Sequence, residues 1–330
     1  MAFSVKGRRV LLLAFFSTFA ALAVSFSLYY LINYKRGRKK GGFIDVYKNR
    51  DGEKTPSSVT VDLELAEILK ENGHGEFTKG TIYKLLELLE KVEDCTLEKL
   101  LGALLNCSAF TTNQNAIREC GGLPQLVSLL VHPNKAVNIK AAQVLSNLAM
   151  NETNQESLKG NICDVIKNIE YHDIVEDEEV ILEHFRLLVN LSATNVAHDE
   201  IITGTQEYFR ILTQAVSRQI QLAVLRLLVN LSCNPNNLGI LLEFKPLLIL
   251  QTFMLPDNPD DIILRAITIS ANLLSSLGNY SQLQQTVLAE HINVLYGELM
   301  GLLDHTNQDI QCQAKRALRS IFAFRIMYTK

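Results

Sequence analysis

Apolar residues recur along this chain at spacings of three and four residues, the pattern of helices that bury one face. The clearest run, NAIRECGGLPQLVSLLVHPNKAVNIKAAQVLSNLAMN, extends from Asn115 to Asn151. It predicts a short helix over 115–120, a glycine turn at 121–122, a second helix over 123–130 and a longer third helix over 135–149. Alternation typical of strands is hard to find, so the sequence predicts an all-α fold.

This run is one copy of a pattern that repeats along the chain. The segment RLLVNLS begins at Arg186 and again at Arg226, and related segments carry an asparagine at the equivalent position. The five equivalent residues are Asn106, Asn147, Asn190, Asn230 and Asn272, with successive separations of 41, 43, 40 and 42 residues. A period of 40–47 residues is typical of helical solenoid repeats. A degenerate sixth copy, AKRALRSI, has Ser320 near the asparagine position.

The wording and period of the repeat resemble the armadillo repeat over roughly residues 80–323. We therefore expect an all-α, right-handed α-solenoid of about six armadillo repeats, preceded by one transmembrane helix. In an armadillo array the third helices stack side by side and line a concave groove. The resemblance implies that the repeated asparagines form a column of amides that binds the backbone of an extended peptide. Alternatively, each asparagine bonds the backbone of its own or a neighbouring repeat, and both roles can coexist.

The residue four positions before each asparagine bears on the kind of ligand. In armadillo proteins that read basic nuclear-import signals this residue is Trp, whereas here the positions hold Gly102, Gln143, Arg186, Arg226 and Thr268. An import-receptor function is therefore not expected. Arg186 and Arg226 would add positive charge to the centre of the groove and favour an acidic partner or a carboxylate. Salt bridges between repeats are the alternative use of these two arginines.

The N-terminal part of the chain differs in character from the repeats. Val10–Tyr34 contains no charged residue over 25 residues, more than the roughly 20 needed to cross a bilayer, and the basic segment KRGRKK follows it. Such a basic cluster resists translocation and would keep the repeats in the cytosol. A cleaved signal peptide is the alternative. The predicted divisions are a short N-terminal segment (1–9), a transmembrane signal anchor (10–34), a basic juxtamembrane segment and linker (35–62), and an armadillo-repeat domain (63–330).

Charge and cysteine usage narrow the classes of function. Residues 1–54 carry a net charge of +8 and the remainder −11, and an acidic body argues against nucleic-acid binding. The six cysteines lie far apart with no CxxC pair, which favours reduced thiols over a disulfide framework. No zincin helix, phosphate loop or nucleophile elbow is present. We therefore expect no enzymatic activity, no metal, no cofactor and no small-molecule substrate.

An N-terminal anchor, a basic cluster, a linker and about six repeats, together with the wording LLVNLSCNP and ILRAITISANL, resemble the armadillo-repeat-containing X-linked family and its autosomal relative. The resemblance implies a single-pass protein of the mitochondrial outer membrane with repeats facing the cytosol. It also implies binding to the Miro–TRAK adaptors of kinesin transport and an effect on mitochondrial distribution and dynamics. The expectation is a tethered scaffold that binds partners through the five asparagines with Arg186 and Arg226. The alternatives are a cytosolic adaptor anchored in the endoplasmic reticulum and, less favoured, a secreted or lumenal repeat protein.

Overall fold

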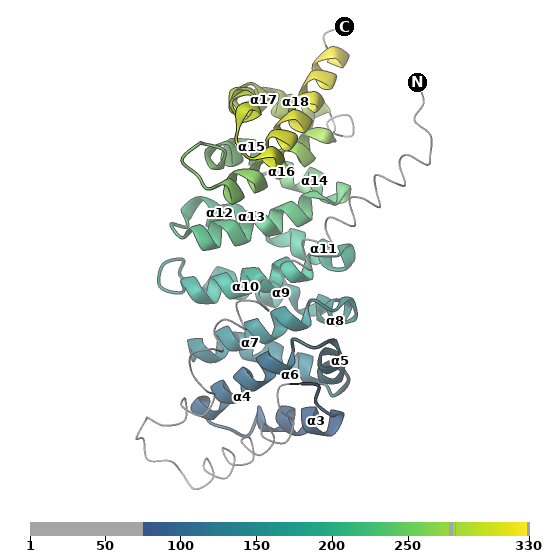
Figure 1. Ribbon diagram of the computed structural model, residues 1–330, viewed down its shortest axis with the longest axis vertical. Coiled ribbons are helices and arrows are strands. Elements are labelled where there is room, and N and C mark those ends of the chain that lie inside the picture. The colour runs from purple at the N-terminus through teal and green to yellow at the C-terminus, as the bar shows by residue number, and fades with distance from the viewer. Residues whose placement is uncertain (1–74, 277–279, 281, 329–330) are drawn as a thin grey trace, which may run out of the picture. The chain divides into compact units, whose positions relative to one another are not determined.

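The structure is a computed structural model that describes residues 75–276, 280 and 282–328. Within these ranges the regular elements are helices, and no strand is present (Figure 1). The predicted anchor Val10–Tyr34 and the linker that follows it lie outside the described residues. None of the described helices has the length and apolar character needed to span a bilayer.

The described helices recur in triplets, as the period of the sequence predicts. The second repeat consists of α5 (Thr111–Glu119), α6 (Gly122–Ser128) and α7 (Lys135–Leu148), close to the three expected segments. Two helices of the first repeat precede it, α3 (Lys79–Leu88) and α4 (Asp94–Cys107). The next three triplets are α8 (Glu152–Leu158), α9 (Ile162–Tyr171) and α10 (Glu178–Leu191); α11 (His198–Ile201), α12 (Thr205–Gln214) and α13 (Arg218–Ser232); and α14 (Leu238–Leu242), α15 (Pro246–Leu250) and α16 (Asp260–Ser275).

The last repeat departs from the triplet. One 20-residue helix, α17 (Gln282–Gly301), stands where earlier repeats have two, and α18 (Gln308–Tyr328) follows as the third helix. Two of the earlier repeats have a left-handed residue between their first and second helices, Gly121 at φ 80° and Lys245 at φ 50°. Pro246 follows Lys245 and starts the next helix. The segment of α17 contains no proline, and no break divides it into two helices.

The third helices stack on one another in chain order. Each of α4, α7, α10, α13 and α16 contacts the third helix of the next repeat, which ends with α18 (Figure 1). A helix between two such neighbours buries more than one stripe, and α13 accordingly buries Ile220, Val224, Leu227 and Leu231. One side of each third helix carries the asparagine position together with the residues four, seven and eleven positions before it, and of these Glu183 and Ala223 are buried. We call this side of the third helices the ladder face.

Close packing between repeats is clearest around Tyr208. The ring of this tyrosine on α12 meets Phe185 of α10 edge to face, with 5.8 Å between ring centroids. Its buried hydroxyl donates a hydrogen bond to the carbonyl oxygen of Ile201 at 2.9 Å. Gly204 allows this approach, because a Cβ atom there would lie 2.5 Å from the tyrosine Oη. These contacts fix α12, the second helix of its repeat, against α10.

Candidate protein-binding face

The predicted asparagines all lie on third helices and occupy equivalent places on the ladder face. Asn106 on α4 is exposed, whereas Asn147, Asn190, Asn230 and Asn272 are half-buried. Ser320 holds the same place on α18 and is also half-buried. The sequence period alone therefore located one residue in each repeat that lies at the uncovered surface.

From the second repeat onward, the asparagine amides bind the preceding repeat. The Nδ2 group of Asn147 donates to the Leu105 carbonyl at 3.3 Å and to the Ser108 Oγ at 3.0 Å, and that of Asn190 donates to the Ser146 carbonyl at 2.7 Å and to the Ser146 Oγ at 3.0 Å. The Nδ2 group of Asn230 donates to the Val189 carbonyl at 3.2 Å and to the Ser192 Oγ at 3.0 Å. The Nδ2 group of Asn272 donates to the Ser232 Oγ at 2.9 Å. The structural interpretation is therefore confirmed for Asn147, Asn190 and Asn230, whose N–H groups reach a backbone carbonyl of the preceding repeat, whereas Asn272 bonds a serine hydroxyl there.

The other half of each amide is available for a ligand. Two acceptors saturate the two Nδ2 hydrogens of Asn147, Asn190 and Asn230. Their Oδ1 atoms take no part in these bonds, and none of the three is a buried acceptor without a partner. Asn272 differs, because its Oδ1 accepts a hydrogen bond from the Nη2 of Arg316 at 2.6 Å. The ladder face therefore presents three carbonyl acceptors in consecutive repeats.

A second set of amides, which our sequence reasoning missed, fixes the ends of the third helices. Asn113, Asn154 and Asn237, each buried in a first helix or just before it, donate to a carbonyl six residues earlier, at 2.9–3.0 Å. The neighbouring Gln114 and Gln155 donate to the backbone carbonyls of Asn147 and Asn190, both at 3.1 Å. The signal was the NQ pair that recurs at 113–114 and 154–155, one period apart. These bonds hold the backbone of the ladder itself in place.

Arg186 lies on the ladder face but is paired within its own helix. It forms an ion pair and hydrogen bond with Glu183, one turn earlier on α10. Burial raises the pKa of the Glu183 carboxyl, while Arg186 and a hydrogen bond from Gln143 on α7 oppose this shift. Arg186 thus forms a salt bridge, but inside its own helix and not between repeats as the alternative expected. Its charge is offset by Glu183, so this residue does not supply the expected positive centre.

A hollow of about 280 Å³ lies beside Arg186 on the ladder face. Its lining combines α10 with the start of α13 and consists of Glu178, Glu179, Leu182, Glu183, Arg186 and Gln219. Three carboxylates against one guanidinium make this central hollow negative. It disfavours an acidic group at the place where the sequence suggested one.

The positive charge of the ladder face gathers nearer its C-terminal end. Arg226 on α13 lies close to Arg265 on α16, and burial first, then the charge of Arg226, lowers the pKa of Arg265. Arg316 on α18 is also half-buried, and desolvation lowers its pKa. The guanidinium group of Arg316 donates to the Thr268 carbonyl at 3.2 Å as well as to Asn272. Of these three arginines, only Arg226 was predicted from the sequence to lie at the binding site.

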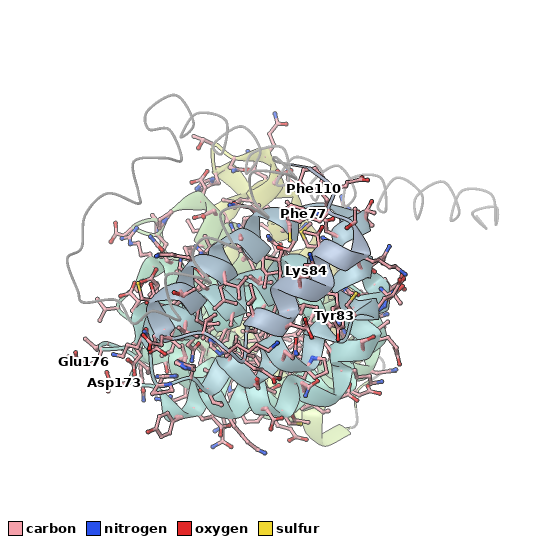
Figure 2. All side chains as sticks on the ribbon, turned by 90° about the horizontal axis from the view of Figure 1, so that it is seen from below. Phe77, Tyr83, Lys84, Phe110, Asp173 and Glu176 are labelled. Carbon is pink, nitrogen blue, oxygen red and sulfur yellow. The ribbon has the colours of Figure 1, made fainter. Side chains whose placement is uncertain are left out.

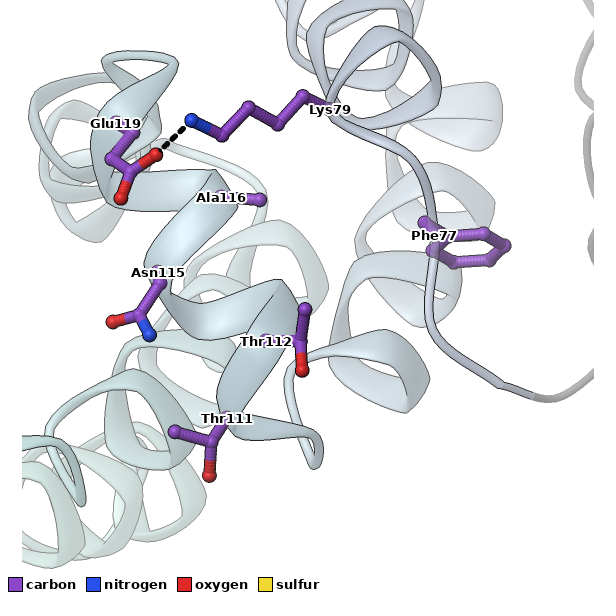
Figure 3. A pocket seen from close by; sticks show the side chains of 7 residues that line it. All are labelled: Phe77, Lys79, Thr111, Thr112, Asn115, Ala116 and Glu119. Carbon is purple, nitrogen blue, oxygen red and sulfur yellow. Dashed lines mark ion pairs between the residues drawn. The ribbon is translucent and has the colours of Figure 1, made fainter.

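A second hollow, of about 470 Å³, lies away from the ladder face (Figure 3). Its lining comes from α5 and the chain at the start of α3, with no contribution from a third helix: Phe77, Lys79, Thr111, Thr112, Asn115, Ala116 and Glu119. Lys79 and Glu119 form an ion pair, which raises the pKa of the lysine and lowers that of the glutamate. Both charged groups are therefore held in their ionised forms by each other rather than prepared for proton transfer.

The acidic residues Asp173 and Asp177, in the loop before α10, form hydrogen bonds and ion pairs with nearby groups. Asp173 accepts hydrogen bonds from the backbone N–H groups of Val175 and Glu176, and its side chain lies at the edge of the repeats with that of Glu176 (Figure 2). Asp177 pairs with Lys135 of α7 and with His172, and the Lys135 bond is the main reason its pKa falls to about 2. Across the described ranges, no group of three His, Cys, Asp or Glu side chains could hold a metal ion.

The helical triplets and the amide ladder define an armadillo-type solenoid, a class whose members typically serve as protein-binding scaffolds rather than as enzymes. A family model described as Armadillo-like matches residues 79–303, and the chain belongs to this family. It is similar to a designed armadillo repeat protein, with 20% identity and a TM-score of 0.63, over 72% of this chain and 99% of that one. A designed armadillo repeat protein in complex with the peptide (KR)4 gives the same identity and TM-score, over 72% and 98% of the two chains. Computationally designed armadillo repeat proteins for modular peptide recognition match at 21% identity and a TM-score of 0.64, over 72% and 99%. At these identities the likeness shows the fold.

Proposed function

We propose that this protein is a membrane-tethered, non-enzymatic scaffold whose ladder face binds an extended segment of a partner protein. The observation that carries the proposal is the row of outward Oδ1 acceptors on Asn147, Asn190 and Asn230, each held by two bonds to the repeat before it. An extended chain presents backbone N–H groups that such acceptors bind. Because the amides are already fixed, binding loses little side-chain entropy.

The designed armadillo repeat protein solved with (KR)4 supports an extended peptide as the ligand of this fold. That peptide is basic. The ladder face of the present chain has no aromatic residue four positions before its asparagines, and it carries arginines in its C-terminal part. We therefore propose peptide binding with a different sequence preference.

The proposal also includes a location. The uncharged stretch Val10–Tyr34 would anchor the chain in the mitochondrial outer membrane, with the repeats in the cytosol and with transport adaptors such as Miro–TRAK as partners. The basic cluster at 35–40 and the resemblance of the sequence support this arrangement. The six cysteines are all unpaired, as suits a reducing compartment.

Protease protection of a C-terminally tagged full-length chain tests the location. The tag should fractionate with mitochondria and be lost when protease is added to intact organelles. Loss of the tag from intact microsomes instead would indicate the endoplasmic reticulum with the same topology. Protection of the tag inside microsomes would contradict a cytosolic ladder face.

Binding is tested separately with purified repeats on peptide arrays derived from transport adaptors. Asn230→Ala removes both the outward acceptor and the bond to the preceding repeat. Ser192→Ala removes one acceptor of that bond and the hydrogen bond that the Ser192 hydroxyl donates to the Val189 carbonyl, but it leaves Oδ1 of Asn230 in place. We expect Asn230→Ala to weaken peptide binding about tenfold and Ser192→Ala to leave it nearly unchanged. Equal losses in the two variants would show that the asparagines act only through the fold.

A further inference from the structure

Equivalent positions at different interfaces between third helices hold residues of different charge. Gln143, four residues before the asparagine of α7, forms a hydrogen bond with Glu183, seven residues before the asparagine of α10. The same two positions at the α13–α16 interface hold Arg226 and Arg265. A neutral-to-acidic contact in one interface is thus replaced by two like charges in another. The positive charge of Arg226 disfavours the charged form of Arg265 and contributes to its lowered pKa.

Arg316 extends this basic pair to a third helix. It holds on α18 the position that Arg226 holds on α13, four residues before the ladder position. Its guanidinium donates only to neutral oxygens, the carbonyl of Thr268 and the Oδ1 of Asn272, and its Nε atom is buried without a partner. A buried donor without a partner is unfavourable for the unliganded protein and is available to a ligand that reorients the group.

The acidic residues nearby do not neutralise these groups. Arg265 donates to the backbone carbonyl of Asp261 at 2.6 Å, and the carboxylate of Asp261 only partly offsets its charge from one turn away. The carboxylate of neighbouring Asp260 is engaged by Asn307 and His305. Among the described residues, neither Arg265 nor Arg316 forms an ion pair. Two half-buried guanidinium groups on one face therefore lack an anionic partner among the residues that the structure describes.

We propose that Arg226, Arg265 and Arg316 make the C-terminal part of the ladder face, from α13 to α18, a basic surface that receives carboxylate or phosphate groups on the extended partner segment. This inference rests on the proposed peptide-binding function and adds its charge preference. Guanidinium groups bind carboxylate and phosphate through paired hydrogen bonds, and partial desolvation strengthens them. The bound anion would also relieve the repulsion between Arg226 and Arg265.

The negative charge of the central hollow determines which end of a partner segment can carry its acidic residues. Glu178, Glu179 and Glu183 repel an anion bound over α10, while the arginines attract one bound over α13 to α18. A partner segment that crosses both regions should therefore carry its acidic or phosphorylated residues at the end that lies over the C-terminal repeats. The three outward acceptors of Asn147, Asn190 and Asn230 can hold the backbone of the remainder.

The test uses purified residues 56–330, the compact unit that contains the repeats, checked for helicity, alongside the full chain in detergent. Pools of short fluorescent peptides differ at one fixed position, which holds Glu, phosphoserine, Gln, Lys or Leu in an otherwise mixed sequence. We expect the Glu or the phosphoserine pool to bind about tenfold more tightly than the Gln pool, and this preference to weaken as salt is raised. The Glu and phosphoserine pools distinguish the two sources of the anion.

A matched pair of double variants locates the preference. Arg265→Gln with Arg316→Gln should abolish the preference for anionic pools. Arg218→Gln with Arg319→Gln removes the same charge from exposed positions on α13 and α18 and should preserve it. Peptide binding without an anionic preference, or with a preference that survives the first double variant, would overturn the anion site and leave the peptide-binding function standing. Failure of every pool to bind the wild-type protein would overturn both.

Discussion

Asn190 donates both hydrogens of its amide to Ser146 of the preceding repeat, one to the carbonyl oxygen at 2.7 Å and one to Oγ at 3.0 Å. The first role of this side chain is therefore to connect α10 to α7. Its Oδ1 is left facing outward as a consequence of the same geometry. One residue type can thus hold neighbouring repeats together and present a hydrogen-bond acceptor on the ladder face, and this explains why an amide recurs inside an apolar segment.

The first prediction concerns the stability of this connection. Asn190→Ala removes two inter-repeat hydrogen bonds and leaves the Ser146 carbonyl without that donor, so we expect a loss of about 1–2 kcal/mol in the free energy of unfolding. Asn106→Ala is the matched control, since this exposed asparagine makes no hydrogen bond with another described residue, and it should change stability by less than about 0.5 kcal/mol. Thermal melting followed by circular dichroism measures both. Equal melting temperatures for the two variants would contradict the structural role.

A second prediction follows from Gly204. A Cβ atom at this position would meet the buried hydroxyl of Tyr208 at 2.5 Å, so Gly204→Ala should displace the ring and destabilise the repeats by about 1–3 kcal/mol. Gly160 lies in a short helix between α8 and α9 and has nothing within 4 Å of an added Cβ. Gly160→Ala should be neutral or stabilise by up to about 1 kcal/mol. Urea unfolding distinguishes them, and similar midpoints would show that the approach at Gly204 is not close.

The third prediction concerns pH and His184, a buried residue of α10. Its Nδ1–H donates to the Val180 carbonyl at 2.8 Å, and its Nε2 accepts from the Nδ2 of Asn168 at 2.7 Å, so the ring is neutral. Burial lowers its pKa from 6.5 to about 4. The unfolded chain therefore binds the proton first, and the stabilisation is complete above the unfolded pKa and lost as pH falls from about 6.5 to about 4.

His184→Gln keeps a polar side chain and removes the titration. Between about pH 7 and about pH 5 the wild-type protein should lose about 2 kcal/mol of stability more than the variant does. Denaturant unfolding of both proteins at the two pH values gives this difference directly. The same loss in both proteins would mean that other groups cause the acid sensitivity.

A fourth prediction contrasts two arginines on the ladder face. Arg186→Gln leaves the carboxylate of Glu183 without its ionic partner, and because Arg186 is itself partly exposed we expect a modest loss of about 1 kcal/mol. Arg265→Gln instead removes a like charge facing Arg226 and should leave stability unchanged or raise it by a few tenths of a kcal/mol. Thermal melts at low and at high salt would show the two effects converging as charge is screened. A marked loss for Arg265→Gln would contradict the repulsion.

Much of the fold could be predicted from the sequence because helical repeats are local. The spacing of the asparagines gave the period, and Gly121 with Gly122 placed the turn between α5 and α6. The fused helix α17 was harder to anticipate, because no motif in the sequence predicts that the first two helices of this repeat join. Helix bounds were predicted for the second repeat only, and there they lie close to those of α5, α6 and α7.

The candidate site could be predicted only in part. The sequence identified which residues lie on the ladder face, but not which half of each asparagine amide faces outward. That choice depends on acceptors in the neighbouring repeat, such as Ser146 for Asn190. The charge of Arg186 was misjudged because its partner Glu183 becomes buried only when α7 and α10 pack together. Arg265 and Arg316 gained importance only once three helices were placed side by side.

The most direct test of the central claim is site-specific photo-crosslinking of the full chain in cells. A photoreactive residue is placed at Gln143 or Thr268 on the ladder face, or at exposed Lys167 on α9 as the control. We predict that the two ladder positions crosslink to one extended segment of the same partner, at sites separated along that segment, and that Lys167 does not. Crosslinks from Lys167 alone, or from the two ladder positions to unrelated proteins, would contradict a ladder face that binds one extended chain.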